Sequence, residues 1–77
     1  MSRTVYHVVH NSDKEVWQVK KEGSSTAIKN FDTKDEAIDY AVELAKNNKP
    51  SQVKIHKKDG TIESERTYGN DPYPPRG

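Results

Sequence analysis

Residues 33–48, TKDEAIDYAVELAKNN, carry the strongest local signal in the chain and decide how the rest is interpreted. Thr33 followed by Glu36 fits a capping box, in which the threonine oxygen accepts from a first-turn amide and the glutamate reaches back to the cap. Apolar residues then recur at helical spacing, namely Ala37, Ile38, Ala41, Leu44 and Ala45. The pattern predicts one amphipathic helix that ends before Pro50, because the residue before proline disfavours helical geometry.

Strand-like segments precede this helix. Residues 5–10, VYHVVH, are β-branched and aromatic, residues 16–20, VWQVK, alternate, and the polar segment 11–14 between them favours a turn. We therefore expect an antiparallel hairpin, and a short third strand over residues 26–30. Alternation places Tyr6, Val8, Trp17 and Val19 inward. It places on the outward face Val5, His7, Val9, Gln18 and Lys20.

A second hairpin follows the helix. Residues 52–57 alternate, with Val53 and Ile55 inward. Asp59-Gly60 predicts a two-residue type I′ turn, which requires positive φ at both central positions. Counting outward from this turn gives the pairs Lys57–Ile62, His56–Glu63, Ile55–Ser64 and Lys54–Glu65. The opposite charges in two of these pairs support the register.

The predicted fold class is therefore α+β, with the order β-β-(β)-α-β-β. We expect an antiparallel or mixed sheet of four to five strands, with one helix on one face and water on the other. Residues 1–67 form the domain, and residues 68–77 form a tail rich in proline and tyrosine that packs on it. The tail has an alternative interpretation as an extended proline-rich ligand. Its candidate residues are Tyr68, Asn70, Asp71, Tyr73 and Arg76.

Composition narrows the class of protein. With 77 residues the chain is one small domain, and 13 basic against 12 acidic residues argue against a strong nonspecific polyanion binder. Zero cysteines exclude disulfides, thiolate metal sites and thiol catalysis. A signal-like apolar segment and a membrane-length apolar run are both absent from the sequence. We expect a cytoplasmic protein without membrane contact.

Three histidines raise the question of metal binding or catalysis. His7 and His10 point to opposite faces of a strand, and His56 approaches His7 only if the first strand neighbours the second hairpin. The chain lacks a carboxylate at short metal-ligand spacing, a Gly-x-Ser-x-Gly elbow and a glycine-rich phosphate loop. We therefore expect no enzyme activity, no metal, no cofactor and no small-molecule substrate.

The uncovered sheet face is the remaining candidate for function. Its predicted binding residues are His7, Val9, Gln18, Lys20, Lys54, His56 and Lys57. An apolar patch at Val5 and Val9 suits a protein-interaction module that binds an unknown partner or forms a homodimer. The alternative is a nucleic-acid-binding module that uses the lysines of this face. Glu63 and Glu65 interrupt the lysines, which weakens that alternative, and an ordinary solvated face remains the simplest reading.

The chain resembles a family of small bacterial proteins, domain-of-unknown-function family 2188. The matching stretches are YHVV at 6–9, WQVK at 17–20, FDTKDEA at 31–37, HKKDG at 56–60 and YGNDPYPP at 68–75. The first turn departs from the family pattern because it lacks a glycine. The resemblance implies a compact cytoplasmic domain and brings no activity with it.

Overall fold

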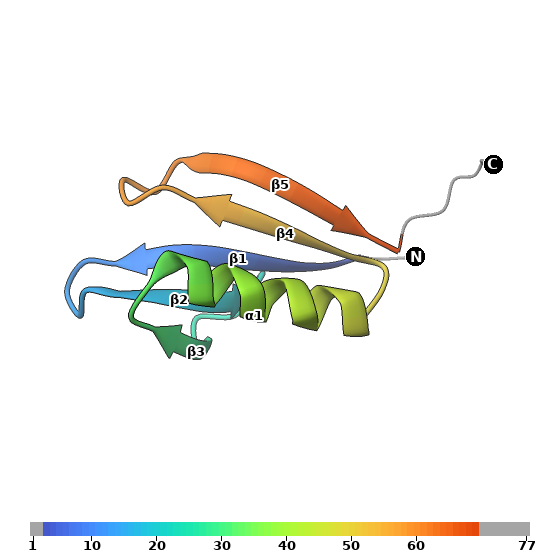
Figure 1. Ribbon diagram of the computed structural model, residues 1–77, viewed down its shortest axis with the longest axis horizontal. Helices are drawn as coiled ribbons and strands as arrows, with labels where there is room; N and C mark the ends of the chain where they lie inside the picture. The colour runs from blue at the N-terminus through green and yellow to red at the C-terminus, as the bar shows by residue number, and fades with distance from the viewer. Residues whose placement is uncertain (1–2, 70–77) are drawn as a thin grey trace.

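The computed structural model describes residues 3–69, which form a five-stranded sheet and one helix (Figure 1). The elements in chain order are β1 (Thr4–Asn11), β2 (Val16–Lys21), β3 (Ala27–Phe31), α1 (Lys34–Asn47), β4 (Ser51–His56) and β5 (Ile62–Tyr68). The strand order is β3-β2-β1-β4-β5. This confirms the predicted α+β class and element order, including the third strand.

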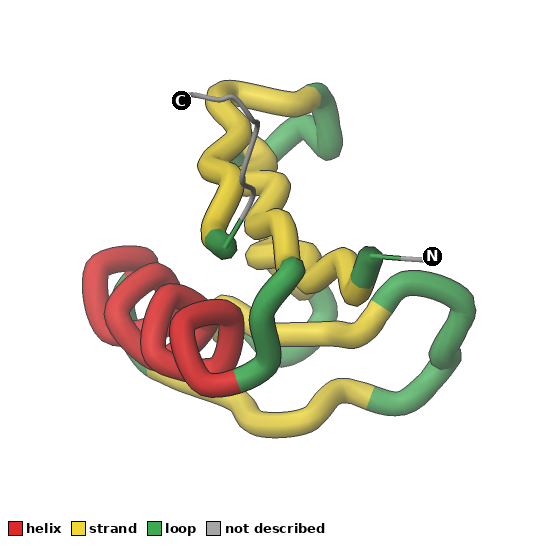
Figure 2. The backbone as a smooth tube through the Cα atoms, turned by 90° about the vertical axis from the view of Figure 1, so that its right-hand side faces the viewer, coloured by secondary structure: helices red, strands yellow, loops and turns green. Residues whose placement is uncertain are grey.

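The sheet is mixed because α1 carries the chain back across it. β1 pairs with β4 in parallel, whereas the other three neighbouring pairs are antiparallel. A parallel neighbour requires a crossover connection, which α1 supplies. Seen along the strands, the sheet is strongly twisted and α1 lies against one side of it (Figure 2). Within residues 3–69, no helix or strand covers the opposite side.

Both ends of α1 follow local rules. Thr33 has an extended φ of −122°, and its hydroxyl accepts a hydrogen bond from the Glu36 amide at 3.3 Å, as the capping pattern predicts. At the other end, the Asn48 side-chain amide donates to the Leu44 carbonyl oxygen at 2.8 Å. That bond satisfies a carbonyl that would otherwise lack a partner within the helix.

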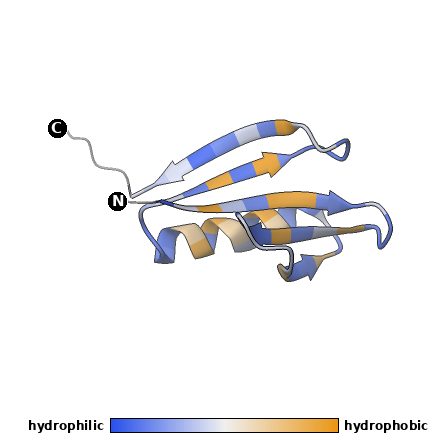
Figure 3. Cartoon of the chain, turned by 180° about the vertical axis from the view of Figure 1, so that it is seen from behind, coloured by the Kyte–Doolittle hydropathy of each residue, from blue (hydrophilic) through white to orange (hydrophobic). Residues whose placement is uncertain are grey.

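The core lies between α1 and the four strands β1 to β4. Its buried residues are Tyr6, Val8, Trp17, Val19, Ala37, Ala41, Ala45, Val53 and Ile55. All were predicted to face inward, and the alternation of core residues with polar residues is visible along β4 (Figure 3). Tyr40 was not predicted as a core contact, but its ring lies 5.3 Å from that of Phe31. Three alanines on the buried helix face allow close approach to the sheet.

The β4–β5 hairpin differs from its prediction in the turn. Lys57 and Thr61 close a three-residue loop, with Gly60 at a φ of 96°, so the two-residue turn was wrong. His56 consequently pairs with Ile62, and the predicted His56–Glu63 and Lys57–Ile62 pairs do not form. A register irregularity between Ile55 and His56 leaves Glu63 as an extra residue in β5.

Beyond that bulge the predicted register returns, with Ile55 opposite Ser64 and Lys54 opposite Glu65. The longer turn and the bulge in β5 therefore cancel in their effect on the strand register. The rest of the hairpin pairs as the sequence predicted. The same strand runs on to Tyr68, which pairs with Ser51 and packs against the core. The predicted tail residues Asn70, Asp71, Tyr73 and Arg76 lie outside the described residues.

Candidate binding face

The open face is the side of the sheet opposite α1. Cross-strand pairing shows that His7 and Val9 of β1 share it with Lys20 and Gln18 of β2, and that Lys54 of β4 lies beside His7. His56 continues the same alternation in β4. Six of the seven predicted binding residues therefore lie on one face. The seventh, Lys57, follows β4 in the turn of the hairpin.

A continuous hydrogen-bonded chain crosses this face, and we call it the histidine chain. His7 Nε2 lies 2.8 Å from Glu22 Oε1, and His7 Nδ1 lies 2.9 Å from His56 Nε2. His56 Nδ1 in turn lies 3.0 Å from the Gly60 carbonyl oxygen. The chain joins the end of β2, the middle of β1, the end of β4 and the hairpin turn. The sequence predicted that His56 approaches His7 only if the first strand neighbours the second hairpin. The pairing of β1 with β4 makes them neighbours.

Sequence reasoning missed Glu22 as a member of this chain. The signal was present, because Glu22 follows Lys20 by two residues and two-residue spacing keeps side chains on one face. The hydrogen bond from His7 is the largest influence on Glu22, and it holds the pKa of that carboxyl below the ordinary value of 4.5. The positive charges of His7 and Lys54 act in the same direction, while partial desolvation opposes them.

Charges of both signs are distributed over the open face. Lys20 and Lys54 lie on the strands to either side of His7, and Glu65 lies opposite Lys54. The Gln52 side-chain amide donates to Glu65 Oε1 at 3.2 Å. The face is therefore close to electrically neutral.

Glu63, which the predicted register placed on this face, instead forms an ion pair with Lys34 at the start of α1. The Lys34 hydrogen bond lowers the pKa of the Glu63 carboxyl from 4.5, against some desolvation. The bulge in β5 explains the change, because one extra residue reverses the side of the strand on which a side chain lies. The same Lys34 ammonium lies 5.2 Å from the centre of the Trp17 ring.

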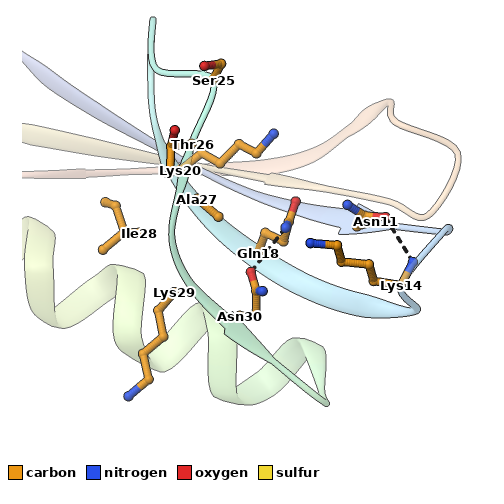
Figure 4. Close-up of a pocket in the computed structure, with 10 residues that line it drawn as sticks. All are labelled: Asn11, Lys14, Gln18, Lys20, Ser25, Thr26, Ala27, Ile28, Lys29 and Asn30. Atoms are coloured by element: carbon orange, nitrogen blue, oxygen red, sulfur yellow. Dashed lines mark hydrogen bonds between the residues drawn. The ribbon is translucent and has the colours of Figure 1, made fainter.

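Gln18 is the one predicted binding residue that is almost inaccessible. Only 7% of it is exposed, and its side-chain amide donates to Asn30 Oδ1 at 3.1 Å. It lies at the base of a hollow of about 480 Å³ over β2 and β3, beside the ends of Lys14 and Lys20 (Figure 4). Gln18 therefore ties β3 to β2, and the lysines are the accessible groups there.

Two further properties concern residues 3–69 only. In this part of the chain no group of three or more histidine or acidic side chains is arranged to hold a metal ion. The single helix described is too short and too polar to cross a bilayer.

Comparison with known proteins agrees with the resemblance seen in the sequence. Neither a curated protein nor a solved structure matches the chain significantly. The model of a family described as "Uncharacterized protein conserved in bacteria (DUF2188)" matches residues 6–68. That match runs from Tyr6 in β1 to Tyr68 at the end of β5, so it includes α1 and the histidine chain. The chain therefore belongs to the family DUF2188.

Proposed function

We propose that this domain is a non-enzymatic binding module of the cytoplasm, which docks another protein on its open face. The observation that carries the proposal is a group of half-buried valines on this uncovered face. Val5 and Val9 of β1 and Val16 of β2 share it with paired polar side chains. An apolar centre with polar groups around it is the usual composition of a protein–protein interface.

The charge pattern supports a protein partner over a polyanion. Lys20 and Lys54 are matched by Glu22 and Glu65 on the same face, so the surface lacks the uniform positive field that phosphate binding requires. The cytoplasmic location draws its support from the absence of cysteine, because small secreted domains usually depend on disulfides.

The test compares two surface variants as affinity baits in lysate of the native host, with or without nuclease. Val9→Lys places a charge in the centre of the open face, and Asp39→Lys makes a control change on the exposed side of α1. We expect the bait with Asp39→Lys to retain every specific partner of the wild type, and Val9→Lys to lose them. Sedimentation over a concentration series detects self-association in the same set. Equal recovery by both variants, or no partner and no self-association, would contradict the proposal.

Nucleic-acid binding is the second candidate, favoured by the position of Lys20 and Lys54 on both sides of His7. The inward orientation of Tyr6 and Trp17 removes the aromatic platform on which single strands usually stack. A fluorescent single-stranded probe at low salt tests this function. Binding that falls steeply with salt and weakens in Lys20→Glu and Lys54→Glu would establish it, and no binding at low salt would exclude it.

A further inference from the structure

The histidine chain determines where its own protons lie. The Gly60 carbonyl oxygen can only accept a hydrogen bond, so His56 Nδ1 carries a hydrogen. An ionised Glu22 carboxylate also only accepts, so His7 Nε2 carries a hydrogen. His7 Nδ1 and His56 Nε2 then face each other at 2.9 Å, and a bond between them needs one hydrogen. For all three contacts to form at once, the two rings must together hold one proton more than two neutral histidines.

We propose that His7 and His56 share this additional proton, and that the histidine chain is a pH-sensitive lock between β2, β1 and the β4–β5 hairpin. The extra positive charge is balanced by the Glu22 carboxylate. The His7–Glu22, His7–His56 and His56–Gly60 contacts form together only while the two rings hold one proton more than two neutral histidines. The lock is a property of the isolated domain and does not depend on the identity of a docked partner.

The ring geometry favours a proton over a metal ion between the two nitrogens. The ring centroids are 5.1 Å apart and the facing nitrogens 2.9 Å apart, so the nitrogens lie near the line that joins the two rings. Such a head-on approach suits an N–H···N hydrogen bond. A zinc ion needs about 2.0 Å to each histidine nitrogen, for which these rings would have to separate or turn.

Charged groups of both signs surround the pair. Among the described residues, Lys20 of β2, Lys54 of β4, Glu65 of β5 and Glu22, which follows β2, share the open face with it. The adjoining turn adds Lys57, Lys58 and Asp59. These groups sum to a single positive charge, and the proton count of the pair decides the state of the lock.

Adding a proton to the His7–His56 pair, or removing the shared one, breaks a contact of the histidine chain. A further proton on His56 Nε2 sets N–H against N–H and brings two cations together, so His7 and His56 separate. If the shared proton is lost, the lone pairs of His7 Nδ1 and His56 Nε2 face each other. If one ring changes tautomer to keep the bond between the histidines, its other nitrogen presents a lone pair to Glu22 or to the Gly60 carbonyl oxygen. On acidification the turn at residues 57–61 loses its tie to β1.

Nitrogen-detected NMR of the histidine rings in the wild-type protein tests the lock directly. In the locked state we expect both His7 nitrogens to carry hydrogen, and His56 to be neutral with its hydrogen on Nδ1. The pair should take up its protons in two separate steps, because coupled groups titrate in macroscopic steps. His10, on the opposite side of β1, is the internal control and should titrate in one step. The amide protection factor of Gly60 should fall by at least about threefold through the acidic step.

A matched pair of variants tests the role of the carboxylate. Glu22→Gln removes the balancing charge, so we expect the midpoint of the first proton uptake to move about 0.5–1 pH unit lower. Glu43→Gln makes the same chemical change on exposed α1 and should leave it unmoved.

Three results would overturn the proposal. One is titration of His7 and His56 in single independent steps, as for His10. Another is an equal response of the two glutamine variants. The third is saturation of both rings by micromolar Zn²⁺, which would show that the site takes a metal ion in place of the proton.

Discussion

At Glu15 the backbone adopts a φ of 55°, a left-handed conformation that side chains with a Cβ disfavour. This residue ends the first turn, residues 12–15, which contains no glycine. The Asn11 side chain holds the same turn by accepting from the Asp13 and Lys14 amides at 3.0 and 3.1 Å. The first turn therefore keeps its shape without glycine, at the cost of local strain.

Glu15→Gly should raise the free energy of unfolding by about 0.5–1 kcal/mol, because relief of strain outweighs the greater entropy of glycine in the unfolded chain. Urea unfolding followed by Trp17 fluorescence measures the change. Lys14→Gly is the control, since that residue has no positive φ and should gain no stability from glycine. A lower stability of Glu15→Gly than of the wild type would refute the assignment of strain.

Gly69 is constrained by its neighbour as well as by its backbone. Its φ is 75°, and a Cβ built on it would lie 2.3 Å from Lys49 Cβ. Gly69→Ala should lower the free energy of unfolding by about 2–4 kcal/mol, since an overlap adds to the cost of the left-handed conformation. Gly23 has a φ of 88° with nothing within 4 Å, so Gly23→Ala should lose only about 1–2 kcal/mol. Equal losses in the two variants would mean that the contact with Lys49 contributes nothing.

At the scale of elements, the cap of α1 offers the most direct test. The Thr33 hydroxyl satisfies the Glu36 amide, so Thr33→Ala should lower the free energy of unfolding by about 1 kcal/mol. Thr33→Ser keeps the oxygen and should retain most of the stability. Circular dichroism during urea unfolding compares both with the wild type. A loss as large in serine as in alanine would attribute the effect to the methyl group.

The β4–β5 hairpin shows which features of an element the sequence predicts and which it does not. Alternation identified the inward residues Val53 and Ile55 correctly, because strand period depends only on the local backbone. The turn after β4 was wrong by one residue, since Asp59-Gly60 is compatible with two-residue and three-residue loops. The three-residue loop is accompanied by a bulge at Glu63, which pairs with Lys34 of α1.

At the scale of the whole molecule, three carboxyl groups link stability to acid pH. Hydrogen bonds from His7, Thr61 and Lys34 lower, respectively, the pKa values of Glu22, Asp59 and Glu63. A carboxyl group whose pKa is lowered on folding stabilises the folded state. This contribution is complete when the pH is above the pKa of the group in the unfolded chain, which is 4.5 for glutamate and 3.8 for aspartate. That contribution is lost as the pH falls through the lower, folded value.

We therefore expect the free energy of unfolding to decline as the pH falls below about 4.5, through the values for Glu22 and Glu63 and then for Asp59. Urea unfolding at intervals from pH 6 to pH 2.5 measures the decline. Glu63→Gln should make it shallower, because one of the three linked groups is then removed. A stability that stays constant across this acidic range would contradict the linkage.

By itself, the sequence determined the helix, its cap, the inward residues of β1, β2 and β4 and the order of elements. These features depend on period and on contacts between near neighbours in the chain, such as Thr33 with Glu36. Tertiary structure alone decided that β1 lies beside β4, because strand neighbours depend on how α1 packs across the sheet. That adjacency brings together His7 and His56, which are 49 residues apart, and so creates the histidine chain.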